Sequence, residues 1–204
     1  MRVLVLGANG KLGHVVAERL AASGHEVRGF VRRIRPGSHV LPRLEYVKGD
    51  ALLESCVIAA LSAEEVVINT IGSGTLKSNT VETDTTRVVL SALQRTSVTR
   101  YIAMSAGMVA PVSFVFDHIV RPLIFANVYR EHREVEALVR ASGLDWTIIR
   151  PPKLRDGPAR GYTESASERP AGPLAISRTD VADFLAKVIA QDLYHRQAVF
   201  VMSR

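Results

Sequence analysis

The chain has 204 residues, of which 47% are hydrophobic and 23% are charged, a composition typical of one globular domain with a sizeable core. The net charge of +6 invites a nucleic-acid-binding interpretation, but the basic residues are spread along the chain and only 6% of the residues are aromatic, too few for a base-stacking surface. The charge therefore favours an anionic small molecule, and the single cysteine, Cys56, excludes an internal disulfide and a thiolate metal cluster.

Apolar runs alternate with helical patterns along the whole chain. The predicted strands are 2–6, 25–31, 44–47, 65–71, 99–104, 145–149 and 198–202, and the predicted helices are 11–22, 52–61, 79–95, 112–141 with a proline break, and 178–191. Such alternation predicts one α/β domain over residues 1–204, a doubly wound parallel sheet of the Rossmann type with helices on both faces. Right-handed crossovers give the strand order 3-2-1-4-5-6, with ligands at the carboxyl ends of the strands.

A glycine turn joins the first predicted strand to the first predicted helix. Gly7, Gly10 and Gly13 form Gly-x-x-Gly-x-x-Gly, a variant of the dinucleotide fingerprint. In that motif the glycines permit a tight turn, a close approach of the backbone to the pyrophosphate, and close packing of the helix, whose N-terminus faces the phosphates. The alternative is a turn that only closes a βα unit. The apolar run before the turn is too short for a signal peptide, so we expect a cytoplasmic protein.

The ends of the second and third strands bear on the choice of cofactor. An acidic residue about 20 positions beyond the glycines favours NAD, because it binds the ribose 2′-hydroxyl. This chain has Arg32 and Arg33 at that point, and guanidinium groups suit a 2′-phosphate, which favours NADPH over NADH. A solvated basic loop is the alternative. Asp50, after the third strand, is expected to lie near the adenine, to cap the next helix, or to do both.

The fifth predicted strand ends at a polar residue, Ser105, at the carboxyl edge where this fold holds its ligand. Its hydroxyl could orient a nicotinamide carboxamide or a substrate carbonyl, or it could satisfy backbone groups at the strand end. Its surroundings do not form the Gly-x-Ser-x-Gly motif of a hydrolase.

The stretch 108–128 is apolar, but Asp117, Arg121 and two prolines interrupt it. A membrane span needs about 20 mostly uncharged residues, so we expect no membrane segment. The stretch is predicted to wall an acceptor site or to form a dimer interface. Farther along, the Gly/Pro-rich segment 155–173 is expected to be a loop or short hairpin on the substrate side, a short C-terminal elaboration of the domain.

Four parts of the sequence together resemble a known family. They are the glycine turn, Gly49-Asp50, Met104-Ser105-Ala106, and the run from Ser142-Gly143-Leu144 to Arg150-Pro151-Pro152. These motifs are similar to those of the atypical short-chain dehydrogenase/reductases, which include NmrA-like regulators and the biliverdin-IXβ reductase type, also called flavin reductase. The resemblance covers nearly the whole chain.

The resemblance implies roles for individual residues at the cofactor. Arg32 would contact the 2′-phosphate, and Ser105 would lie close to the nicotinamide. The pyrophosphate loop would consist of Gly7, Asn9, Gly10, Lys11 and Leu12, the adenine site of Asp50 and Ala51, and the nicotinamide-ribose site of Thr70, Ile71 and Gly72.

At two positions the candidate catalytic residues of this chain differ from those of the family. The flavin reductase type has histidine after the Pro-Pro pair, where this chain has Lys153. Classical members use Tyr-x-x-x-Lys, where this chain offers Tyr129-x-x-x-Arg133, with both side chains on one helical face. Arginine keeps the positive charge but cannot shuttle protons. Ser105, Tyr129 and Lys153 are the catalytic candidates, with a helix-surface role as the alternative for Tyr129. No metal is expected, because the six histidines lack metal-ligand spacing.

The sequence thus predicts an NADPH-dependent reductase that passes hydride to a flavin, a quinone or a similar conjugated small molecule. The expected partners are this acceptor and no nucleic acid or membrane, with the chain a monomer or a homodimer through 108–128. A non-catalytic NAD(P)H-binding redox sensor of the NmrA-like type is the first alternative. A nucleotide-sugar epimerase or dehydratase is the second, although little chain follows Pro152 to form a large substrate domain.

Overall fold

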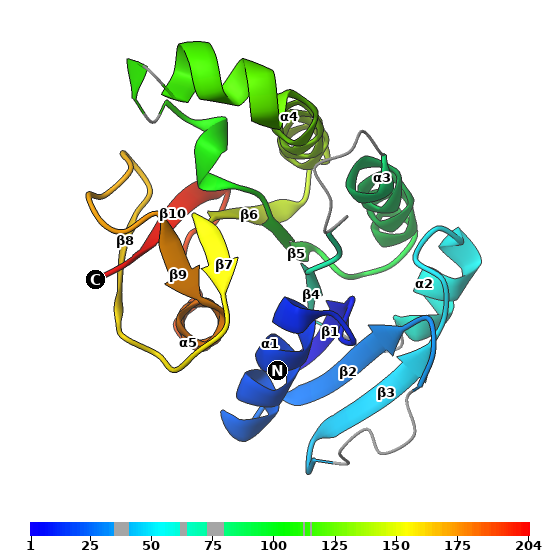
Figure 1. Cartoon of the computed structure of the whole chain (residues 1–204). Helices are drawn as coiled ribbons and strands as arrows, with labels where there is room; N and C mark the ends of the chain where they lie inside the picture. Colours follow the sequence, from blue (N-terminus) through cyan, green and yellow to red (C-terminus); the bar gives the residue numbers. More distant parts are fainter. Residues whose placement is uncertain (35–40, 62–64, 73–79, 112, 115) are drawn as a thin grey trace.

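The computed structural model describes residues 1–34, 41–61, 65–72, 80–111, 113–114 and 116–204. Its centre is an eight-stranded sheet of order β3-β2-β1-β4-β5-β6-β10-β8 (Figure 1). The strands are β1 (Arg2–Leu6), β2 (Glu26–Val31), β3 (Leu44–Lys48), β4 (Val66–Asn69), β5 (Arg100–Met104), β6 (Asp145–Arg150), β8 (Tyr162–Ser165) and β10 (Gln197–Ser203). All neighbouring pairs are parallel except β8 and β10. The predicted doubly wound sheet and its order are confirmed.

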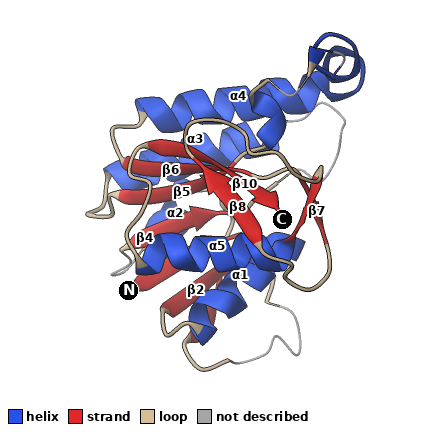
Figure 2. Ribbon diagram, turned by 90° about the vertical axis from the view of Figure 1, so that its left-hand side faces the viewer, coloured by secondary structure: helices blue, strands red, loops and turns tan. Residues whose placement is uncertain are grey.

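Helices cover both faces of the sheet (Figure 2). One layer contains α1 (Lys11–Ala22) and α5 (Arg178–Ala190), and the other contains α2 (Glu54–Ala60), α3 (Val81–Gln94) and α4 (Ala126–Ala141). The central strand β1 supplies both layers because alternate side chains of a strand point to opposite faces. Val3 and Val5 belong to the core under α1 and α5, whereas Leu4 and Leu6 belong to the core under α2, α3 and α4.

The C-terminal elaboration is more regular than predicted. The segment 155–173 is neither a plain loop nor a hairpin, because its strand β8 pairs antiparallel with the distant β10. Two further short strands, β7 (Lys153–Arg155) and β9 (Ala175–Ser177), form a separate parallel pair. β7 and β8 have only three or four residues each, mostly polar and half-buried, which is too little periodicity to be recognised in a sequence.

The helical region that contains Pro122 also differs from the prediction. After a single 3₁₀ turn (η1, Gly107–Val109), residues Phe116–Phe125 form a π-type helix (η2) that contains Pro122 and runs directly into α4. The predicted proline break is therefore absent, because the helix continues through Pro122 and changes from π-type to α at Ala126. Residues 79, 112 and 115 of the predicted helices lie outside the described residues. Among the helices that the structure describes, none is long and apolar enough to cross a membrane.

Candidate functional site

The glycine turn between β1 and α1 is built at very close range. Gly7 has a φ of +81°, and its carbonyl accepts a 2.7 Å hydrogen bond from the Gly10 amide. A Cβ atom on Gly13 would lie 2.3 Å from the Gly7 carbonyl oxygen and 2.5 Å from Thr70 Oγ1. Position 7 thus requires glycine because its backbone is left-handed. Position 13 requires glycine because any side chain would collide with the turn against which α1 begins.

The N-terminus of α1 offers hydrogen-bond donors to an anion. Gly10 is the N-cap residue, so it has no side chain to accept from the first-turn amides, and the first turn contains no acidic residue. Lys11 is exposed at the first helical position, and Leu12 is buried behind it. Among the described residues no side chain accepts from the first-turn amides, so these amides, the helix dipole and a lysine together form a site suited to phosphate.

The two predicted arginines lie beside this turn. Arg32 and Arg33 follow β2 directly and are exposed. The Asn9 side-chain amide donates a hydrogen bond to the Arg33 carbonyl, and the Gly7 amide donates one of 3.1 Å to the carbonyl of Phe30 near the end of β2. The structure therefore brings the glycine turn and the two arginines together at one edge of the sheet.

Asp50 and Ala51 lie at the carboxyl end of β3, next to the end of β2, where the Gly49 amide donates to the Val31 carbonyl at 2.9 Å. The predicted helix cap is wrong, because α2 begins at Glu54 and its N-cap residue is Leu53. Asp50 instead accepts a 3.0 Å hydrogen bond from the Leu52 amide, which orders the turn that precedes the helix.

At the end of β4 the backbone is fixed by buried hydrogen bonds. The Thr70 amide and hydroxyl both donate to the Leu6 carbonyl, at 3.1 and 2.7 Å. Asn69 accepts from the Ile71 amide at 3.0 Å and donates to the Tyr101 hydroxyl at 3.0 Å. Burial raises the pKa of Tyr101 to about 12, so this hydroxyl stays neutral. The Thr70 hydroxyl is thus engaged within the protein. Ile71 lies next to the glycine turn, and Gly72 follows it.

Ser105 belongs to a buried polar network, centred on Glu136, that joins β5, β6 and α4. Its hydroxyl donates a 2.8 Å hydrogen bond to Glu136 Oε1, and Arg150 donates from Nε to Oε1 at 2.9 Å and from Nη2 to Oε2 at 2.6 Å. Ser105 is 6% exposed and Glu136 is 5% exposed. Burial acts to raise the pKa of Glu136, but the hydrogen bonds and charge of Arg150 outweigh it, so the pKa is lowered and the carboxylate is ionised.

The other two catalytic candidates lie apart from this network. The Tyr129 hydroxyl accepts a 3.2 Å hydrogen bond from Arg133, and the Arg121 guanidinium lies 4.6 Å from the centre of its ring. The residue of α4 that reaches Ser105 is Glu136, seven positions or about 10 Å farther along the helix axis than Tyr129. Lys153 begins β7 beyond the carboxyl end of β6, and its side chain is exposed.

A second buried cluster was missed by the sequence analysis. Glu131 on α4 accepts a 3.0 Å hydrogen bond from the Glu82 amide, so it caps the N-terminus of α3 from another helix. Burial raises the pKa of Glu131. His132 Nδ1 lies 3.2 Å from Glu82 Oε2, and a Cβ atom on Gly72 would lie 3.5 Å from Glu82 Oε1. His132 packs between α3 and α4 close to the end of β4.

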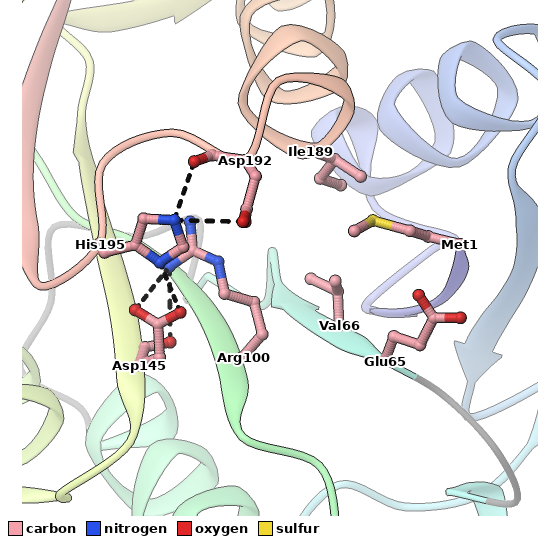
Figure 3. A pocket seen from close by; sticks show the side chains of 8 residues that line it. All are labelled: Met1, Glu65, Val66, Arg100, Asp145, Ile189, Asp192 and His195. Carbon is pink, nitrogen blue, oxygen red and sulfur yellow. Dashed lines mark hydrogen bonds and ion pairs between the residues drawn. The ribbon is translucent and has the colours of Figure 1, made fainter.

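A cavity of about 140 Å³ lies at the opposite edge of the sheet (Figure 3). Arg100 and Asp145, the first residues of β5 and β6, line it together with His195. The Asp145 carboxylate lies between the guanidinium of Arg100 and the imidazole of His195, 3.3 Å from Arg100 Nη1 and 2.7 Å from His195 Nδ1. Because ligands of this fold bind at the carboxyl ends of the strands, this cavity is not the cofactor site.

Comparisons with known proteins agree with this geometry. A Bacillus subtilis protein named as an uncharacterized sugar epimerase, YhfK, is 28% identical over 193 residues, which cover 89% of this chain and 85% of that protein. The structure of a candidate NADH-flavin reductase from Streptococcus pneumoniae shares the fold with a TM-score of 0.84 and 16% identity, over all of both chains. A wide-type short-chain dehydrogenase/reductase from Veillonella parvula, solved with NADP, matches with a TM-score of 0.77 and 20% identity, over 99% of this chain and 94% of that one.

The sequence model of a family described as NAD(P)H-binding matches residues 7–192, from the first glycine of the turn to the residues after α5. The match includes the glycine turn, the strand ends and the Ser105 network described above. The protein therefore belongs to this NAD(P)H-binding family and has the fold of the atypical short-chain dehydrogenase/reductases.

Proposed function

We propose that the protein is an NADPH-dependent reductase that transfers hydride to a flavin, a quinone or a similar conjugated small molecule. The observation that carries the proposal is the uncapped, acid-free N-terminus of α1 behind a tight glycine turn, with Arg32 and Arg33 beside it. A turn that only closed a βα unit would not need Asn9 to bond the Arg33 carbonyl and so keep two exposed arginines beside it.

The residues present fit a dinucleotide along the whole carboxyl edge. The first-turn amides of α1 would hold the pyrophosphate, and Arg32 and Arg33 would hold the 2′-phosphate with charge-assisted hydrogen bonds. Asp50 and Ala51 would contact the adenine. The nicotinamide end would lie against Thr70, Ile71, Gly72 and Ser105, and when bound it supplies the hydride.

The acceptor side is proposed to need little acid–base chemistry from the protein, because solvent can protonate a reduced flavin or quinone. Lys153 is exposed beyond the carboxyl end of β6 and is the candidate for binding an anionic group of the acceptor. Tyr129 stays a weaker candidate, since its hydroxyl and ring are already engaged by two arginines.

The test is a fluorescence titration with NADPH and NADH, followed by measurement of absorbance at 340 nm with flavin, quinone and biliverdin acceptors. Arg32→Glu is expected to weaken NADPH binding by about tenfold to a hundredfold and to weaken NADH binding less, because a charged hydrogen bond to the 2′-phosphate is lost. Arg130→Glu, an exposed arginine on α4, is the matched control and should leave both affinities unchanged. Equal losses for NADPH and NADH would remove the assignment of Arg32.

The two alternatives give different results in the same assay. A redox sensor would bind NADPH without turnover of any acceptor. A sugar epimerase, the class named for the Bacillus subtilis relative, would convert a nucleotide-linked sugar without net oxidation of the dinucleotide. The arginine at the lysine position of Tyr129-x-x-x-Arg133 argues against the second alternative, because that chemistry uses a tyrosine whose proton moves.

A further inference from the structure

The buried carboxylate of Glu136 stands out among the polar groups near the proposed nicotinamide site. A carboxylate that is 5% exposed is costly unless it is paired and hydrogen-bonded. Arg150 satisfies both oxygens in a bidentate arrangement, and Arg140 approaches Oε2 at 3.5 Å. Arg150 is itself held over the Phe200 ring, 5.3 Å from its centre. The anion is thus clamped in a single position.

The clamp determines what Ser105 can do. A serine hydroxyl has one hydrogen to donate and two lone pairs that accept. The hydrogen of Ser105 is directed to Glu136 Oε1 at 2.8 Å, because an ionised carboxylate can only accept. Toward any other neighbour the Ser105 oxygen therefore offers lone pairs. It can accept from an amide N–H, and it cannot donate to a carbonyl.

Backbone hydrogen bonds to β6 and the residues after it also fix the position of Ser105. The Ser105 amide donates to the Ile149 carbonyl at 2.8 Å, and the Gly107 amide donates to the Pro151 carbonyl at 2.7 Å. The pairing of β5 with β6 thus continues past the end of β5 at Met104. Both the position of the oxygen and the direction of its hydrogen are fixed by groups of β6 and α4.

We propose that Glu136, clamped by Arg150, is a positioning residue that makes Ser105 an obligate acceptor for the carboxamide N–H of the nicotinamide. This inference rests on the proposed function. Ser105 then orients the cofactor and does not protonate the acceptor. Glu136 touches neither cofactor nor acceptor and acts only through Ser105.

The experiment compares two ligands by isothermal titration calorimetry. NADPH carries the nicotinamide, whereas adenosine 2′,5′-bisphosphate lacks it and reports the adenosine half alone. Glu136→Gln and Ser105→Ala are each expected to weaken NADPH by about fivefold to tenfold, the value of one hydrogen bond, and to leave the bisphosphate affinity unchanged. In the Ser105→Ala background, Glu136→Gln should cause no further loss of NADPH affinity.

Glu134→Gln, on the exposed side of the same helix, is the matched control and should change neither affinity. If Glu136→Gln fails to fold, Glu136→Asp keeps the charge but withdraws it from Ser105, and it should give the same selective loss. A loss that is equal for both ligands, or that persists unchanged in the Ser105→Ala background, would overturn the positioning role. Absence of binding of either ligand to the wild-type protein would instead overturn the proposed function.

Discussion

Gly13→Ala is a direct test of how tightly the phosphate-binding turn is built. The added Cβ would lie 2.3 Å from the Gly7 carbonyl oxygen, so the start of α1 must move by about 1 Å to reach ordinary contact. Overpacking costs about 1–3 kcal/mol, and a backbone contact this short belongs at the upper end. Alanine recovers about 1 kcal/mol of helix propensity over glycine. The expected net loss is about 2 kcal/mol of unfolding free energy, a drop in Tm of about 4–8 °C for a domain of this size.

Urea unfolding monitored by circular dichroism, with the m-value checked for constancy, measures this loss. The same shift should weaken NADPH binding at least tenfold, because the first-turn amides no longer face the pyrophosphate. Gly10→Ala is the matched control. Gly10 has a φ of −73°, and its Cβ would meet a single atom at 3.1 Å, so the loss should stay below about 1 kcal/mol. A Gly13→Ala protein as stable as wild type, with unchanged NADPH affinity, would refute the steric reasoning.

Two further predictions concern other parts of the molecule. Hydrogen bonds, first to Asp145 and then to the Asp192 carbonyl, raise the pKa of His195, so its stabilising effect should be complete below the ordinary pKa of about 6.5 and lost as the pH rises through the raised value. His195→Gln should flatten the dependence of the urea midpoint on pH above about pH 6.5. The change will be small because the side chain is 47% exposed. An unaltered pH profile would rule out His195 as its source. Phe114 and Leu123 are 75% and 79% exposed, so we expect self-association through 108–128 that Leu123→Ser weakens in sedimentation velocity; a wild-type protein that stays monomeric at every concentration would contradict this.

The parts of the fold that the sequence predicted depend on local patterns. The unbroken apolar run of β1 indicates a strand buried on both faces, and the glycines at fixed spacing place a turn and a helix after it. The position of Arg32 and Arg33 relative to that turn follows from strand order alone. These features can be predicted from the sequence because each depends on residues that are close together in the chain.

The parts that could not be predicted depend on pairs far apart in the chain. Ser105 and Glu136 are 31 residues apart, and Glu131 caps a helix that begins about fifty residues earlier. Nothing in the spacing of α4 distinguishes the buried Glu136 from the exposed Glu134, since both occur in a highly charged helix. Tyr129 was selected by its i+4 register with Arg133, but which residue reaches the strand end is decided by how α4 packs on the sheet.

The alternation along β1 has a consequence for how the protein unfolds. Val3 and Val5 anchor one helical layer, and Leu4 and Leu6 anchor the other, so a single five-residue strand is shared by two cores that otherwise contact different helices. Neither layer can separate from the sheet without exposing side chains of the strand on which the other depends. The neighbouring strands β4 and β5 also contribute side chains to both cores. The amide protons of these central strands, β1 included, should therefore exchange with solvent only through global unfolding.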